Sequence, residues 1–297
     1  MAVDVGRTCC PDMSTPLADR PAIDEAFLGL SDIAGGVRFT VEKRLARPDR
    51  RLFGGTAIAV SLAAIERVTG QDVLWATAQL VGTAPVGAEV DCAVDVLAKG
   101  HRTSQLRVTA TSEGEVVFQA LGAAATLKGP DDALAGQGGT MPTVTPPEES
   151  HRFWRGARPD DAGWHGLVDM RSGADGVGGE RGRVCLWMRL IDGQPWTPAR
   201  LSFVADMVPM AVARTSGSFG AGTSLDNTLR MGRLVDTDWV LLDLNPHVAS
   251  GGYGTGTALL WAEDGTLLAV ASQTSTIFEM PFDPLDIERV MKARPDL

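Results

Sequence analysis

Three polar residues in the second half of the chain, Asp206, Ser224 and Gln273, are the strongest candidates for chemistry in this sequence. Asp206 stands in the segment FVADMVPMAV and is the only charged residue between positions 201 and 213. A carboxylate on a buried helix is costly unless it is paired or hydrogen-bonded. A helix residue that faces solvent is the alternative, but the apolar residues around Asp206 favour a functional carboxylate.

Ser224 and Gln273 lie in strand-like segments. Alternation along the strand would put Ser224 on one face with Asp226, Thr228 and Arg230. A hydroxyl and a side-chain amide can each donate and accept hydrogen bonds, so both could hold a reacting water. Taken alone, each is better explained as an ordinary polar position, a solvated strand face for Ser224 and a sheet edge for Gln273.

The elements that would position these residues are predicted twice, in the same order. After a short helix at 23–30, an alanine-rich apolar helix at 53–68 begins at Gly54-Gly55 and is followed by four strands. A strand at 183–190 precedes a second apolar helix at 198–213, again followed by four strands. The strands, rich in Val, Leu and Thr, are expected at 73–83, 88–98, 101–111 and 115–127, and at 223–231, 238–246, 252–262 and 266–277.

A constant register of 151 positions relates the two halves, which indicates an internal duplication. Two pairs of turn glycines obey it, and the starts of the expected strands follow it to within one position. The register pairs the three candidate residues with positions that carry no functional side chain, so one site per chain is expected. These pairs are Gly55 with Asp206, Val73 with Ser224 and Gly122 with Gln273.

An apolar helix followed by antiparallel strands predicts an α+β protein in which a curved sheet wraps a central helix, twice over. The expected division is a disordered leader over 1–20, an N-terminal unit over 21–128, a linker over 129–165 and a C-terminal unit over 166–297. The linker is assigned from its GPDD, GQGG and TPPEE segments, which lack apolar periodicity.

Composition excludes several classes of protein. The formal net charge of −10 argues against nucleic-acid binding, because an acidic chain repels phosphates. No apolar run is long enough for a membrane span, and the N-terminus has no apolar core of a secretory signal, so a cytoplasmic protein without membrane insertion is expected. Cys92 and Cys185 lie in strand patterns typical of buried, reduced thiols. The cysteine and histidine spacing predicts no metal site, and no cofactor is expected.

The familiar catalytic and nucleotide-binding motifs are missing or out of context. GYGTGT at 252–257 is glycine-rich, but no helix is expected directly after it. It therefore lacks the helix N-terminus that a phosphate-binding loop needs. There is no GxSxG segment. The four histidines are scattered through turns and the linker, where none is favoured as a catalyst.

Several segments together resemble the acyl-CoA thioesterase II (TesB-like) family. The first half has LFGG at 52–55, TAPVG at 83–87 and KGHRTSQLRV at 99–108. The second half has LWMRL at 186–190, the pair AD at 205–206, SLDNTLRM at 224–231, DWVLLD at 238–243 and GTLLAVASQ at 265–273. The resemblance runs from about Phe53 to Phe278, and the order and spacing of the segments carry it.

The resemblance implies a double hotdog fold, with two tandem units that each wrap a sheet around a helix, and a homo-oligomer of such chains. It implies hydrolysis of acyl-CoA by a water that Asp206, Ser224 and Gln273 hold, with Ser224 where many relatives have Thr. The substrate is expected near six residues, with backbone N–H groups at the helix start for the oxyanion and basic side chains for CoA. They are Gly54, Gly55, Thr56, Arg51, Lys99 and Arg102.

Two other functions remain open at this stage. A hotdog enoyl-CoA hydratase would use related substrates, but that chemistry usually needs an Asp/His pair, and no His lies near Asp206 in the sequence. A non-catalytic protein that binds acyl thioesters would need the same pocket and no reactive water. Release of free CoA, loss of the enoyl absorbance, or binding alone would separate the three functions.

Overall fold

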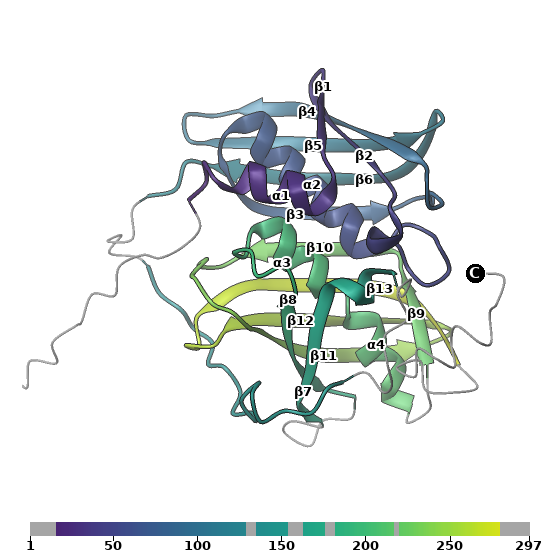
Figure 1. Cartoon of the computed structure of the whole chain (residues 1–297), viewed down its shortest axis with the longest axis vertical. Coiled ribbons are helices and arrows are strands. Elements are labelled where there is room, and N and C mark those ends of the chain that lie inside the picture. The colour runs from purple at the N-terminus through teal and green to yellow at the C-terminus, as the bar shows by residue number, and fades with distance from the viewer. Residues whose placement is uncertain (1–15, 129–134, 154–162, 176–181, 217–219, 280–297) are drawn as a thin grey trace, which may run out of the picture.

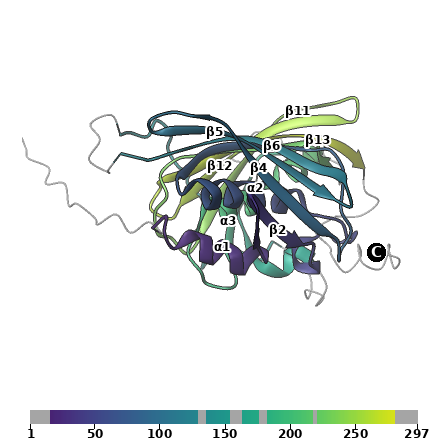
Figure 2. The same ribbon diagram turned by 90° about the horizontal axis from the view of Figure 1, so that it is seen from above.

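The computed structural model describes residues 16–128, 135–153, 163–175, 182–216 and 220–279. One sheet of 13 strands runs through both halves, and the helices lie together on one side of it, as Figure 2 shows from above. Among the described residues, no helix has the length and apolarity needed to cross a membrane.

The first half begins with helix α1 (Arg20–Leu28), which starts three residues before the helix expected at 23–30. Short strands β1 (Ser31–Ile33) and β2 (Gly36–Thr40) and the turn η1 (Lys43–Leu45) lead to helix α2 (Gly54–Thr69). The four predicted strands follow as β3 (Asp72–Leu80), β4 (Glu89–Lys99), β5 (Thr103–Ser112) and β6 (Glu115–Ala125).

The second half repeats this order. After the turn η2 (Gly163–Leu167), strands β7 (Val168–Asp175) and β8 (Val184–Leu190) precede helices α3 (Pro198–Ala205) and α4 (Val208–Ala213) and the turn η4 (Arg214–Ser216). Five strands follow: β9 (Gly220–Ser224), β10 (Asp226–Met231), β11 (Val240–Ser250), β12 (Tyr253–Ala262) and β13 (Leu267–Glu279). Strands β4 and β11 lie 151 positions apart at both ends, so the predicted register holds.

The strand order gives the sheet an approximate two-fold symmetry. It runs β1-β2-β4-β5-β6-β3-β10-β13-β12-β11-β8-β7, with β9 attached to β13. Reading outward from the centre, β3, β6, β5 and β4 on one side match β10, β13, β12 and β11 on the other (Figure 1). The antiparallel pair β3 and β10, with Thr77 opposite Thr228, joins the halves into one sheet.

The central helix α2 is apolar on nearly its whole surface because two layers cover it. The sheet packs on one side, and α3 of the second half packs against it on another. The helix ends where Gly70 takes the left-handed conformation (φ 61°) that closes a helix. The expectation of a buried helix inside a curved sheet is therefore confirmed for the first half.

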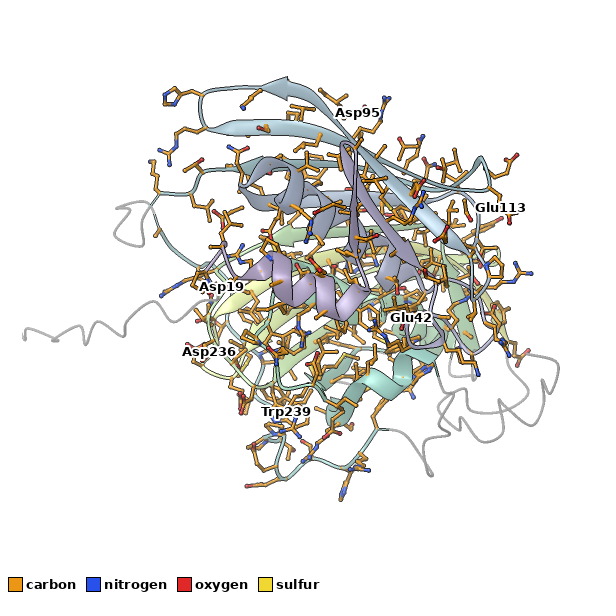
Figure 3. All side chains as sticks on the ribbon, turned by 45° about the horizontal axis from the view of Figure 1, so that its top comes forward. Asp19, Glu42, Asp95, Glu113, Asp236 and Trp239 are labelled. Carbon is orange, nitrogen blue, oxygen red and sulfur yellow. The ribbon has the colours of Figure 1, made fainter. Side chains whose placement is uncertain are left out.

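The segment expected as a linker packs against the second half where it is described. Residues 135–150 run without helix or strand over the face of the sheet that carries Trp187 and Trp261. Trp187 Nε1 donates to the Thr145 carbonyl over 2.8 Å, and Met141 packs on the same cluster. The nearby Trp239 marks this end of the molecule in Figure 3, opposite Asp95 of β4.

The described part of the chain bears on two further expectations. Cys92 and Cys185 are buried free thiols, as predicted. Of the leader expected over 1–20, residues 1–15 lie outside the described residues, and α1 starts at Arg20.

Candidate active site

The second apolar segment forms two short helices, so the prediction of one helix over 198–213 is wrong. Helices α3 and α4 are separated by two residues, of which Asp206 is the first. Pro209 lies in the first turn of α4. It has no N–H for the Ala205 carbonyl, and its ring would collide with that carbonyl in a continuous helix. Asp206 therefore belongs to an interruption between helices, with φ −73° and ψ 50°.

Asp206, Ser224 and Gln273 are brought into hydrogen-bond contact. Ser224 Oγ donates to Asp206 Oδ1 over 2.9 Å. The amide Nε2 of Gln273 donates to the same carboxylate oxygen and lies 3.2 Å from Ser224 Oγ. Residues from the α3–α4 junction, β9 and β13 thus converge on one buried oxygen.

The helix break also fixes the orientation of the Gln273 amide. Gln273 Oε1 accepts the backbone N–H of Val208, at 3.2 Å, which is the first N–H of α4 and has no partner inside the helix. With its oxygen held by Val208, the amide must present its nitrogen to Asp206. Gln273 is 1% exposed, so its amide is held in this orientation inside the protein.

An extra residue in the chain at Leu225 sets the direction of the Ser224 side chain. Ser224 pairs with Ser275 of β13, whereas Thr228 pairs with Ser272 of the same strand. Four steps along β9 and β10 therefore face three steps along β13, which is a β-bulge. A bulge of one residue reverses the face on which all later side chains lie.

The bulge corrects the expected grouping of Ser224 with Asp226, Thr228 and Arg230. Ser224 lies on the inner face with Gln273, toward the helices. The other three lie on the outer face, where Asp226 Oδ1 accepts the N–H of Thr274 and Arg230 is exposed. Only Ser224 of this set reaches the carboxylate.

The first half contributes backbone to the site. The backbone N–H of Gly55, at the start of α2, lies near the Asp206 carboxylate and lowers its pKa. A Cβ at Gly54 would lie 2.6 Å from Asp206 Oδ2, and one at Gly55 would lie 2.4 Å from the Phe203 carbonyl. The two glycines are therefore required by the close approach of α2 to the α3–α4 junction.

Burial dominates the electrostatics of Asp206. Desolvation raises the pKa of Asp206 to about 6. Gln273, Ser224, the Gly55 N–H and the charge of Arg47 lower the pKa, but their effect is smaller than that of desolvation. A carboxyl with a pKa near 6 is largely ionised at neutral pH, yet it is basic enough to accept a proton from water.

Arg47 was not singled out from the sequence. It forms an ion pair with Asp49, and its Nη1 lies 3.5 Å from Thr223 Oγ1, next to Ser224. The RPDRR run at 47–51, just before the two glycines, was the available signal. The loop itself folds through two backbone bonds between Arg47 and residues 50 and 51.

Thr56 and Arg51 are close to Gly54 and Gly55 in the sequence, but one is buried and the other is exposed. Thr56 is fully buried, and its hydroxyl donates to the Leu45 carbonyl over 2.8 Å, so it has no exposed surface for a substrate. Arg51 is exposed, three residues before Gly54.

Lys99 and Arg102 lie at the opposite end of α2, contrary to expectation. Gln71, which follows α2, contacts the Arg102 carbonyl and the hydroxyl of Ser104, the residue paired with Lys99. The 16 residues of α2 separate this end from Gly54, and a helix of that length spans about 24 Å. Within one chain these two cations do not border the Asp206 site.

In the described part of the chain, no group of three His, Cys, Asp or Glu side chains is arranged to hold a metal ion.

Two family models match the chain. The acyl-CoA thioesterase N-terminal domain matches residues 42–125, and the acyl-CoA thioesterase C-terminal domain matches residues 142–277. No match was found among the curated proteins compared with the chain.

Solved structures agree with these matches. A protein from Novosphingobium aromaticivorans, assigned as a thioesterase, is 30% identical, with a TM-score of 0.75 over 83% of this chain and 97% of its own. A hot dog fold protein from Alicyclobacillus acidocaldarius is 20% identical, with a TM-score of 0.75 over 87% and 98%.

An acyl-CoA thioesterase II from Mycobacterium marinum is 19% identical, with a TM-score of 0.69 over 87% of this chain and 99% of its own. At this identity it supports the fold, which is the double hotdog expected from the sequence. The chain belongs to the acyl-CoA thioesterase II (TesB-like) family of double-hotdog enzymes.

Proposed function

We propose that this protein hydrolyses acyl-CoA thioesters with a single water held by Asp206, Ser224 and Gln273. The observation that carries the proposal is the convergence of a hydroxyl and an amide on one buried carboxylate. Such a carboxylate can accept a proton from water, while the hydroxyl and amide orient the water's lone pairs. The family membership supports the same chemistry.

In the proposed reaction, Asp206 takes one proton as the water oxygen bonds to the thioester carbonyl carbon. The C–S bond then breaks, and the proton on Asp206 passes to the leaving thiolate. The products are a carboxylic acid and free CoA. The N-terminus of α2 at Gly54 offers positive potential for the oxyanion, because unpaired N–H groups point out of a helix start.

The exposed Arg50 and Arg51 are the proposed contacts for the phosphates of CoA. Both lie in the loop that leads to Gly54, on the site's side of α2. Guanidinium groups suit phosphates because they bind them with two parallel hydrogen bonds. Lys99 and Arg102 could serve only if another chain brought them close.

Rival chemistries are tested by the same assay. Purified protein is mixed with saturated and unsaturated acyl-CoA, and free thiol and enoyl absorbance are followed together. Thiol release supports hydrolysis. Loss of enoyl absorbance without thiol would indicate a hydratase, and binding with neither would indicate a non-catalytic acyl-thioester protein. Among the described residues, the side chains that hydrogen-bond to Asp206 include no imidazole, which favours hydrolysis.

The pH dependence of hydrolysis should report the ionisation of Asp206. The general base must be ionised, so kcat/KM is expected to rise with pH through about 6, the raised pKa of Asp206, and to level off above pH 7. The measurement is kcat/KM from pH 4.5 to 8.5 with a stable acyl-CoA. A rate that stays constant down to pH 4.5 would rule out Asp206 as the base.

Two variants separate the role of the Ser224 hydroxyl from the effect of side-chain size. Ser224→Ala removes the donor to Asp206, and a loss of about 10²-fold in kcat/KM is expected. Ser224→Thr keeps the hydroxyl and should retain activity within about tenfold, since many relatives are expected to carry Thr here. Equal losses in both variants would mean that packing, and not the hydroxyl, is what matters.

We infer units at 21–128 and 166–297 joined by a linker at 129–165, and a homo-oligomer. A CoA thioester as substrate implies that the protein acts in the cytoplasm.

A further inference from the structure

Asn227 is a fully buried amide that the protein leaves without a partner. Its exposure is 0%, and within the described parts of the chain neither Oδ1 nor Nδ2 has a hydrogen-bond partner. An unpaired buried amide is destabilising, and such groups are rare in folded proteins. A partner that is not part of the chain is therefore expected at this position.

The register of the strands puts Asn227 beside the proposed catalytic residues. On one side it pairs with Ala78 of β3, a buried residue of the inner face. On the other side, the pairing of Thr228 with Ser272, continued by one residue, sets Asn227 next to Gln273. Neighbouring side chains on one sheet face lie about 5 Å apart at Cβ.

Asn227 is more buried than Ser224, which lies on the same face of the sheet. Ser224 is partly buried, whereas Asn227 is 0% exposed, beside the equally buried Gln273. Beyond it the inner face is apolar, with Leu229 and Ala271 in the core. A thioester bound at Ser224 with CoA outside would direct its acyl chain past Asn227.

We propose that Asn227 determines substrate specificity by hydrogen bonding an oxygen on the acyl chain, a few bonds from the thioester carbon. This inference rests on the proposed thioester hydrolysis. The amide can donate to an oxo oxygen, and it can both donate to and accept from a hydroxyl. A plain alkyl chain would leave both amide groups unpaired, so acyl groups that carry a hydroxyl or oxo oxygen are the favoured substrates.

The small neighbours of Asn227 fit this assignment. Ala78 on β3 and Ala271 on β13 flank it on the inner face. Neither carries a polar side chain that could reach the amide. A contact from Asn227 to the thioester carbonyl itself would be a different role, because it would help every acyl-CoA equally.

The test compares hexanoyl-CoA with β-hydroxyhexanoyl-CoA and β-oxohexanoyl-CoA, by thiol release. The wild-type enzyme is expected to favour the oxygenated substrates by about 10²-fold in kcat/KM. Asn227→Leu and the smaller Asn227→Ala should lose that preference, mainly through slower turnover of the oxygenated substrates, while hexanoyl-CoA changes little. Thr228→Val, on the outer face of the same strand, is the control and should keep the preference.

Thermal melts accompany the kinetics, and Asn227→Leu, which roughly keeps the side-chain volume, should not melt below the wild type, because no protein hydrogen bond is lost. An equal loss on all three substrates would overturn the proposal in favour of a thioester contact. Unchanged preference, or a clear drop in the melting temperature of Asn227→Leu, would overturn it in favour of a buried water. Absence of thiol release from any substrate by the wild type would instead refute the hydrolysis itself.

Discussion

Asp206→Asn is expected to lower kcat/KM for acyl-CoA hydrolysis by about 10³-fold, because it removes the base but keeps the size of the side chain. The remaining site should persist, since Ser224 and Gln273 can still donate to the Asn oxygen. Asp236→Asn is the matched control: the same chemical change at an exposed carboxylate, which lies at the molecular surface in Figure 3. Activity of Asp206→Asn within about tenfold of wild type would mean that another group activates the water.

The stability of Asp206→Asn should depend on pH differently from that of the wild type. The folded-state pKa of Asp206 is raised from 3.8 to about 6, so the wild type has a stabilising contribution below pH 3.8 that is lost as the pH rises through 6. The loss amounts to about 3 kcal/mol at most.

Asn at position 206 does not titrate. The free energy of unfolding of Asp206→Asn, minus that of the wild type, should therefore rise between pH 4 and pH 7. Urea melts of both proteins across this range measure the difference, in which the titration of every other group cancels. A difference that does not change with pH would show that folding does not raise the pKa of Asp206.

Gly54→Ala is expected to lower activity by about 10²-fold, because the added methyl group collides with the carboxylate. Its Cβ would lie 2.6 Å from Asp206 Oδ2 and 3.2 Å from Leu80 Cδ1. Asp206 is held by hydrogen bonds from Ser224 and Gln273, so it can move only by losing those bonds. Displacement of a catalytic group by about 1 Å is enough for a loss of this size.

Gly54→Ala should also lower the stability of the protein. In an ordinary helix, Gly→Ala stabilises by about 0.5–1 kcal/mol, whereas here we expect a loss of about 1–3 kcal/mol from overpacking. Gly136→Ala, at an exposed position with no atom near its Cβ, is the control and should change neither activity nor melting temperature. Full activity of Gly54→Ala would indicate that α2 and the α3–α4 junction lie further apart than described.

The catalytic candidates illustrate how far local sequence carries a prediction. Asp206 stood out because it interrupts an apolar segment, and that signal is local. Ser224 and Gln273 gave no such signal alone, and only the repeat and the family resemblance grouped them with Asp206. Asn227 gave none, since an Asn inside a strand pattern has no unusual composition.

The sequence by itself determined the order of the elements, the register of 151 positions between the halves and the restriction of the candidate side chains to one half. These follow from periodicity and spacing, which depend on residues near each other in the chain. The tertiary structure alone decided the helix break at Asp206, the bulge at Leu225 and the approach of Gly55. It also moved Lys99 and Arg102 to the far end of α2. A bulge or a close approach depends on how distant segments pack, and a shift of one residue, invisible to periodicity, decides which side chain faces the site.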